Sequence, residues 1–125
     1  MKKSKVSIKT GSVDEFFKSV RENAKKLDRG EAIEPSITIT FEDPLEMLQF
    51  LSAERVRLLR KTKSGALPIA HLASQLKRDL RAVSRDVSRL EKAGLLRTSF
   101  RTNPGHGRCK IVEPVAREFV LTASI

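Results

Sequence analysis

The sequence predicts an α+β fold that is mainly α, with three short helices, a β-hairpin after them, and a strand-and-helix extension before them. Apolar residues recur at helical spacing between residues 53 and 93, and capping and stop residues divide that stretch into three helices. Two strand-like runs then flank a turn that contains proline and glycine. We therefore expect an N-terminal extension over 1–50, a helix-and-hairpin domain over 51–113, and a C-terminal strand or tail over 114–125.

The extension begins with a strand and an amphipathic helix. Lys5 to Lys9 alternates as a short strand, and Ser12 followed by Glu15 forms a capping box that predicts a helix running to Leu27. One stripe of this helix is apolar, made of Val13, Phe16, Phe17, Val20, Ala24 and Leu27. Such a stripe must be buried against another surface.

A linker over 29–35, in which Gly30 stops the first helix, separates it from the rest of the extension. Residues 37–41 alternate between apolar side chains and threonine, which predicts a half-buried strand. Asp43 as N-cap and Pro44 at the first helical position then predict a second helix. Its apolar residues are Leu45, Met47, Leu48, Phe50 and Leu51.

The three helices of the domain have clear boundaries. Ser52 caps a helix over 53–63 with Val56, Leu58 and Leu59 inward, and Pro68 opens a helix with Ile69, Leu72, Ala73 and Leu76 inward. Lys77 and Arg78 form a turn, Asp79 caps the third helix, and Gly94 stops it. Residues 95–101 and 108–112 then form the hairpin.

The third helix has one face for a core and one for a polyanion. Its apolar stripe consists of Leu80, Val83, Val87 and Leu90, while Arg78, Arg81, Arg85, Arg89 and Lys92 share a sector about 80° wide. A merely solvated face usually mixes signs, whereas Arg81, Arg85 and Arg89 repel one another at i,i+4 spacing. A polyanionic ligand would relieve that repulsion.

Charge is distributed unevenly along the chain. Residues 1–50 hold nine basic and nine acidic side chains, and residues 51–125 hold sixteen and six, so the net charge of +10 comes from the last 75 residues. This asymmetry, together with the cationic helix, favours nucleic-acid binding over simple solvation.

Three helices followed by a hairpin form a winged helix-turn-helix, and the sequence resembles known members of that class. AVSRDVSRLEKAGLL, residues 82–96, resembles the recognition helix and first wing strand of MarR-type regulators of bacteria and archaea, and IAHLASQL resembles the helix before it. Residues 41–96 are similar to a group of small winged-helix regulators that share a stretch like FEDPLEMLQFLSAERVRLLR. The resemblance implies DNA binding and usually a dimer. For some members it implies an antitoxin that represses its own operon beside an RNase-type toxin.

In such a fold the third helix, residues 79–93, enters the major groove with its N-terminal half nearest the bases. We expect Arg81, Ser84 and Arg85 at base edges and Ser88 at a base or phosphate. The expected phosphate contacts are Arg78, Arg89 and Lys92. The wing would place Arg101, His106 and Arg108 near a minor groove or the backbone, although solvation of the hairpin is an alternative for the two arginines.

Surplus apolar surface predicts a homodimer. The stripe over 13–27, the strand over 37–41 and the run 119–125 exceed what a winged domain needs, so we expect them to build a two-fold interface. One alternative is that the neutral N-terminal part or residues 117–125 bind a toxin protein. The other is RNA binding, which the absence of Trp and Tyr argues against because single-strand recognition uses exposed aromatic side chains.

The sequence predicts no enzyme, cofactor or metal site. His71, His106 and Cys109 lack the paired spacing of a zinc site, and no glycine-rich phosphate loop or nucleophile–histidine–acid grouping is present. We expect His71 to be a partly buried helix residue and Cys109 a packed thiol. Asp86 should orient Arg85 or Arg89, or pair with a neighbouring helix. A single cysteine and no apolar run of membrane-spanning length lead us to expect a cytoplasmic protein.

Overall fold

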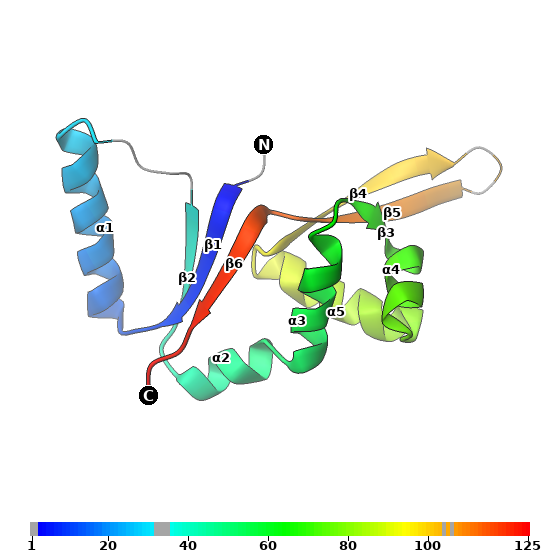
Figure 1. Ribbon diagram of the computed structural model, residues 1–125, viewed down its shortest axis with the longest axis horizontal. Coiled ribbons are helices and arrows are strands. Elements are labelled where there is room, and N and C mark those ends of the chain that lie inside the picture. The colour runs from blue at the N-terminus through cyan, green and yellow to red at the C-terminus, as the bar shows by residue number, and fades with distance from the viewer. Residues whose placement is uncertain (1–2, 32–35, 104, 106) are drawn as a thin grey trace. The chain divides into compact units, whose positions relative to one another are not determined.

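The computed structural model describes residues 3–31, 36–103, 105 and 107–125, and Figure 1 labels their helices and strands. The chain forms two compact units. The sheet unit comprises residues 3–50 and 116–125, and the winged unit comprises residues 51–115. No helix in the described part of the chain has both the length and the apolar composition needed to span a membrane.

The sheet unit is built on three parallel strands. In chain order its elements are β1 (Lys3–Thr10), α1 (Val13–Asp28), β2 (Ser36–Phe41), α2 (Pro44–Phe50) and β6 (Ala116–Thr122). The strand order is β2-β1-β6, so β1 is central and pairs in parallel with both neighbours, as Figure 1 shows. The C-terminal segment is therefore a strand that joins the first strand of the chain.

The register gives this sheet one apolar and one polar face. Val6 lies between Ile37 and Phe119, and Ile8 lies between Ile39 and Leu121. Val6 and Ile8 are 0% and 1% exposed, which makes them the core of the unit, and Met47 of α2 is buried with them. The opposite face carries Ser7, Lys9, Thr38, Thr40, Val120 and Thr122.

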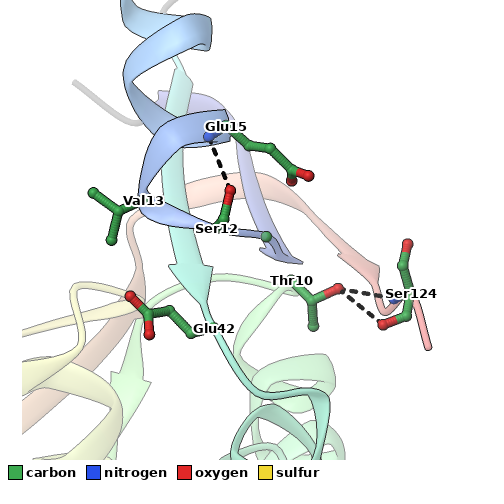
Figure 2. A pocket seen from close by; sticks show the side chains of 7 residues that line it. Thr10, Ser12, Val13, Glu15, Glu42 and Ser124 are labelled. Atoms are coloured by element: carbon green, nitrogen blue, oxygen red, sulfur yellow. Dashed lines mark hydrogen bonds between the residues drawn. The ribbon is translucent and has the colours of Figure 1, made fainter.

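Helix α1 begins at the capping box that the sequence predicts. The hydroxyl of Ser12 accepts a hydrogen bond of 3.1 Å from the backbone N–H of Glu15, which Figure 2 shows. The helix ends at Asp28, and Gly30 follows with a φ of 75°, a left-handed conformation that glycine adopts without strain. No residue of α1 is buried, so the predicted stripe has no cover within the described chain.

The winged unit is a winged helix-turn-helix, which confirms the predicted fold class. Its elements are α3 (Ala53–Thr62), β3 (Leu67–Pro68), α4 (Ile69–Leu76), α5 (Leu80–Lys92), β4 (Leu96–Asn103) and β5 (Gly107–Pro114). The strands form an antiparallel sheet in the order β3-β5-β4, in which β4 and β5 are the wing. Side chains that are fully buried between the helices and the wing include Leu58, Leu72, Val83, Val87, Leu90, Leu95 and Val112.

The turns of the winged unit follow the sequence signals. Three side chains, those of Asp79, Leu80 and His71, differ from the sequence-based expectation. Lys77 has a φ of 55° at the end of α4, and Gly94 has a φ of 89° after α5. Asp79 occupies the N-cap position of α5, but its side chain makes no capping hydrogen bond. The prediction that Leu80 belongs to the buried apolar stripe of α5 was wrong. Leu80 is 46% exposed because it precedes the first buried turn of the helix. His71 is exposed rather than partly buried, since it lies on the outer side of α4.

Candidate nucleic-acid interface

Helix α5 separates its cations from its apolar residues as the sequence predicts. Val83, Val87 and Leu90 have no exposed surface, and they fix the helix against the rest of the winged unit. On the other side, Ser84 and Ser88 are half-buried, and the long cationic side chains are exposed. These exposed side chains, which we call the cationic face, are Arg81, Arg85, Arg89 and Lys92.

The arginines of the cationic face have no acidic partners in the described part of the chain. Among the described residues, no carboxylate lies within ion-pairing distance of Arg81, Arg85 or Arg89. Like charges one helical turn apart disfavour the helix. The arrangement is therefore suited to a ligand that carries a regular series of negative charges.

The first turns of α5 border a hollow of about 650 Å³. It is lined by Asp79, Leu80, Arg81, Ser84 and Arg85. Leu80 was missed as a site residue because on a helical wheel it falls beside the core positions of α5. The one sequence signal against burial was its place as the first helical residue, since its side chain leans towards the helix N-terminus and away from the packed turns.

Asp86 forms an ion-pair network on the inner side of α5. Its Oδ1 accepts from Arg55 Nε of α3 at 3.1 Å, and its Oδ2 accepts from Arg78 Nη1 at 2.9 Å. Arg78 Nε also lies 3.5 Å from Glu54 Oε2. Burial by itself raises the pKa of Asp86, but the hydrogen bonds from Arg78 and Arg55 outweigh it and hold the pKa below its ordinary value of 3.8.

This network assigns roles to two residues of the sequence analysis. Asp86 pairs with a neighbouring helix, one of its two expected roles. Arg78 is turned towards Asp86 and Glu54 and is only 22% exposed, so it lies apart from the cationic face. Its expected phosphate contact remains a prediction, against which these ion pairs weigh.

The wing carries an exposed aromatic side chain beneath an arginine. The guanidinium of Arg108 lies 4.2 Å from the ring centroid of Phe100, and Phe100 is 57% exposed. Arg101 is exposed opposite Cys109, on the other face of the hairpin. His106, expected at the wing tip, lies outside the described residues.

A carboxylate connects the wing to the end of α5. Glu91 Oε2 accepts from the backbone N–H of Thr98 at 3.1 Å and from its hydroxyl at 2.5 Å. Both bonds join the last turn of α5 to β4. They orient the wing relative to the cationic face.

The remaining candidates for chemistry are dispersed. His71 Nε2 lies 2.9 Å from the side-chain nitrogen of Gln75, and the thiol of Cys109 is half-buried. In the part of the chain that the structure describes, no three His, Cys, Asp or Glu side chains are grouped to hold a metal ion.

A separate hollow of about 550 Å³ lies in the sheet unit, at the carboxyl end of β1 (Figure 2). It is bordered by Glu15 and Glu42, and the hydroxyl of Thr10 accepts from the backbone N–H of Ser124 beside it, at 2.8 Å. Two carboxylates at its wall disfavour a phosphate there. The winged unit therefore holds the stronger candidate site.

Comparison with known proteins supports the fold. The family model HVO_A0114 matches residues 50–112. A structure described as a possible transcriptional regulator from Methanosarcina mazei Go1 is 20% identical, with a TM-score of 0.52 over 61% of this chain and 66% of that one. The match thus spans just under two thirds of that protein's length, and at this identity it shows the fold alone.

Two further structures are more distant. Reduced HlyU from Vibrio cholerae N16961 is 15% identical over 79% of this chain and 82% of that one, with a TM-score of 0.49. The homodimeric winged helix-turn-helix DNA-binding domain Mb0332 from Mycobacterium bovis, described as a possible ArsR-family regulator, is 13% identical over 61% and 73%, with a TM-score of 0.45. None of these three descriptions names the MarR type, so that finer resemblance remains a prediction. No curated protein matches the chain significantly.

Proposed function

Since the chain belongs to the HVO_A0114 family and folds as a winged helix-turn-helix, we propose that it is a sequence-specific double-stranded DNA-binding transcriptional regulator that acts as a repressor. The observation that carries the proposal is the cationic face of α5, whose arginines are exposed and lack acidic partners among the described residues. DNA carries a phosphate about every 1.7 Å of helix axis, so several phosphates lie within reach of such a series of cations.

The proposed readout divides α5 by position. Its N-terminal half would lie in the major groove, where Arg81 and Arg85 can each bridge O6 and N7 of guanine and Ser84 can donate to or accept from a base edge. Arg89 and Lys92, further along the helix, would hold phosphates, and Ser88 either. On the wing, Arg108 above Phe100 and Arg101 are the cations offered to the backbone or minor groove.

Leu80 adds an apolar contact to this surface. It is exposed in the same hollow as Arg81 and Arg85, and the 5-methyl group of thymine is the apolar feature of the major groove. We assign Leu80 to thymine recognition beside a guanine that an arginine reads. This would make the preferred sequence contain both bases in each half-site.

The alternatives have less support. Phe100 is the one strongly exposed aromatic residue of the described winged unit, and it lies under Arg108, which leaves few platforms for stacking single-stranded RNA. An antitoxin role remains a prediction from the resemblance. It is compatible with DNA binding, and it would be tested by co-purification with the product of a neighbouring gene.

The deciding experiment measures binding to a duplex from the chain's own upstream region and to a random duplex, across a salt series. We expect a preference of about 10³-fold or more for the upstream duplex, and we expect Arg85→Ala to abolish most of it. Arg60→Ala removes the same charge from an exposed position on α3 and is the matched control, which should retain the preference.

Equal affinity for both duplexes would contradict the proposal. Binding through phosphates alone predicts that outcome, with log K falling by about 0.9 per neutralised phosphate for each decade of salt.

A further inference from the structure

Helix α1 presents an apolar stripe that nothing in the described chain covers. The exposed fractions are 51% for Val13, 38% for Phe16, 51% for Phe17, 49% for Val20 and 63% for Leu27. The rings of Phe16 and Phe17 contact each other edge to face, with centroids 5.7 Å apart. An exposed stripe of this length on a helix of 16 residues marks an interaction surface.

The chain's own sheet does not supply the missing cover. A groove of about 370 Å³ separates the start of the stripe from the sheet, where Val13, Phe16 and Phe17 face Thr40 and Glu42. Thr40 belongs to the polar face of the sheet. An apolar partner must therefore come from elsewhere.

The charges of α1 are arranged so that the helix complements itself. Its first turn carries Asp14 and Glu15, and its last turn carries Lys25 and Lys26 ahead of the final Asp28. When two such helices pack antiparallel, the acidic first turn of each lies beside the lysines at the end of the other copy. When they pack in parallel, like charges meet at both ends.

The sizes of the apolar side chains lead to the same orientation. Val20 lies midway along the stripe, between Val13 and Leu27, so an antiparallel pair centred there brings Phe16 level with the small Ala24 of the other copy, with Phe17 one residue further along. A parallel pair would instead place phenylalanine against phenylalanine and alanine against alanine. Interdigitation of large and small residues gives the denser packing.

We propose that α1 pairs antiparallel with α1 of a second copy of this chain and so forms the two-fold interface of a homodimer. A two-fold interface uses the same patch on both copies and must be self-complementary, which this helix is in both charge and shape. This dimer rests on the regulator function proposed above, but the two experiments that test it use the protein alone, without DNA. Failure of either proposal can therefore be distinguished from failure of the other.

The first experiment is sedimentation of the full chain at tens of micromolar. The wild type should be a dimer, and Val20→Glu should raise the dimer dissociation constant at least tenfold because it places two carboxylates at the two-fold axis. Lys18→Gln makes the same change in charge on the opposite side of α1, as the control, and should leave the constant unchanged. Circular dichroism checks that both variants keep their helices. A monomeric wild type, or a dimeric Val20→Glu, would overturn the proposal.

The second experiment tests orientation by disulfide cross-linking in a Cys109→Ser background. A mixture of Val13→Cys and Leu27→Cys chains should form disulfides between the two variants, because antiparallel helices bring position 13 of one copy near position 27 of the other. Cross-linking within the Val13→Cys variant alone would indicate parallel helices. A dimer that forms neither cross-link would place the interface on another surface, and either result would overturn the antiparallel pair.

Discussion

At the scale of single residues, Asp86 is what separates the two kinds of arginine in the winged unit. It holds the guanidinium groups of Arg55 and Arg78 on the inner side of α5, so those two cations are paired within the protein. Arg81 and Arg85 lie on the outer side, where no described carboxylate pairs with them. Asp86, on the inner side, thus helps to hold the helices in the arrangement that exposes Arg81 and Arg85.

We expect Asp86→Asn to lower the free energy of unfolding by about 3–5 kcal/mol, since it leaves two guanidinium groups without their common carboxylate. The folded-state pKa of Asp86 lies below its ordinary value of 3.8, so the carboxylate stabilises the fold fully above that pH. The advantage of the wild type over the variant should shrink as the pH falls below 3.8 and through the folded-state pKa. Urea denaturation at several pH values measures both effects.

The matched control for this prediction is Glu113→Gln. Its carboxylate lies 3.8 Å from Arg97 Nε, and the two side chains are 36% and 45% exposed, so the substitution should cost about 1 kcal/mol or less. If the two variants lost equal stability, the network would have no special role in the fold.

Leu80 gives a second prediction at this scale. Replacing the contacted thymine of the upstream duplex by deoxyuridine removes only the methyl group, and we expect wild-type affinity to fall about three- to tenfold. Leu80→Ala should bind both duplexes with equal, reduced affinity, because the methyl group then has no apolar partner. A titration of the two duplexes against both proteins measures the coupling. If Leu80→Ala still distinguished the duplexes, Leu80 would not be the thymine contact.

At the scale of elements, the stability of the sheet unit depends on the apolar face of β1. Ile8→Ala should lower the free energy of unfolding by about 2–5 kcal/mol, because it opens a cavity at a residue that is 1% exposed between Ile39 and Leu121. Val120→Ala, on the other face of β6, is the control and should cost less than about 1 kcal/mol at 36% exposure. Denaturation monitored by circular dichroism compares them, and equal losses would place the core elsewhere.

Most elements could be predicted from the sequence because their signals are local. Ser12, Ser52 and Gly94 act within one turn of the helices they begin or end, and alternation predicts strands such as β2 from neighbouring residues. The pairing of β1 with β6 could not be predicted in this way, because no local pattern records which of several short strands will be neighbours.

In the candidate site, too, the features with a local sequence signal could be predicted, and those that depend on tertiary packing could not. The cationic face follows from helical periodicity alone. The inward engagement of Arg78 depends on Asp86 and Glu54, which only the packing of three helices brings together, and the exposure of Leu80 depends on where that packing ends.

At the scale of the whole molecule, a two-fold dimer implies a two-fold operator. Two copies of α5 in successive major grooves would lie about 34–36 Å apart, one helical turn of DNA. Inserting 5 base pairs between the half-sites turns them to opposite sides of the duplex and should lower affinity to near that of a single half-site. Inserting 10 base pairs returns both half-sites to the same side of the duplex and serves as the control. Unchanged affinity with the 5-base-pair insertion would indicate that the two winged units bind independently.

The parallel pairing of β1 with β6 also has a consequence for the order of folding during synthesis. β1 is synthesised early, but its partner β6 is made only after the entire winged unit, residues 51–115. Domains fold as units as they emerge, and the closure of so long a loop is slow. The winged unit should therefore be complete while β1 still lacks a neighbour on one side. On this order, α5 would be in place before the sheet that carries α1 has closed.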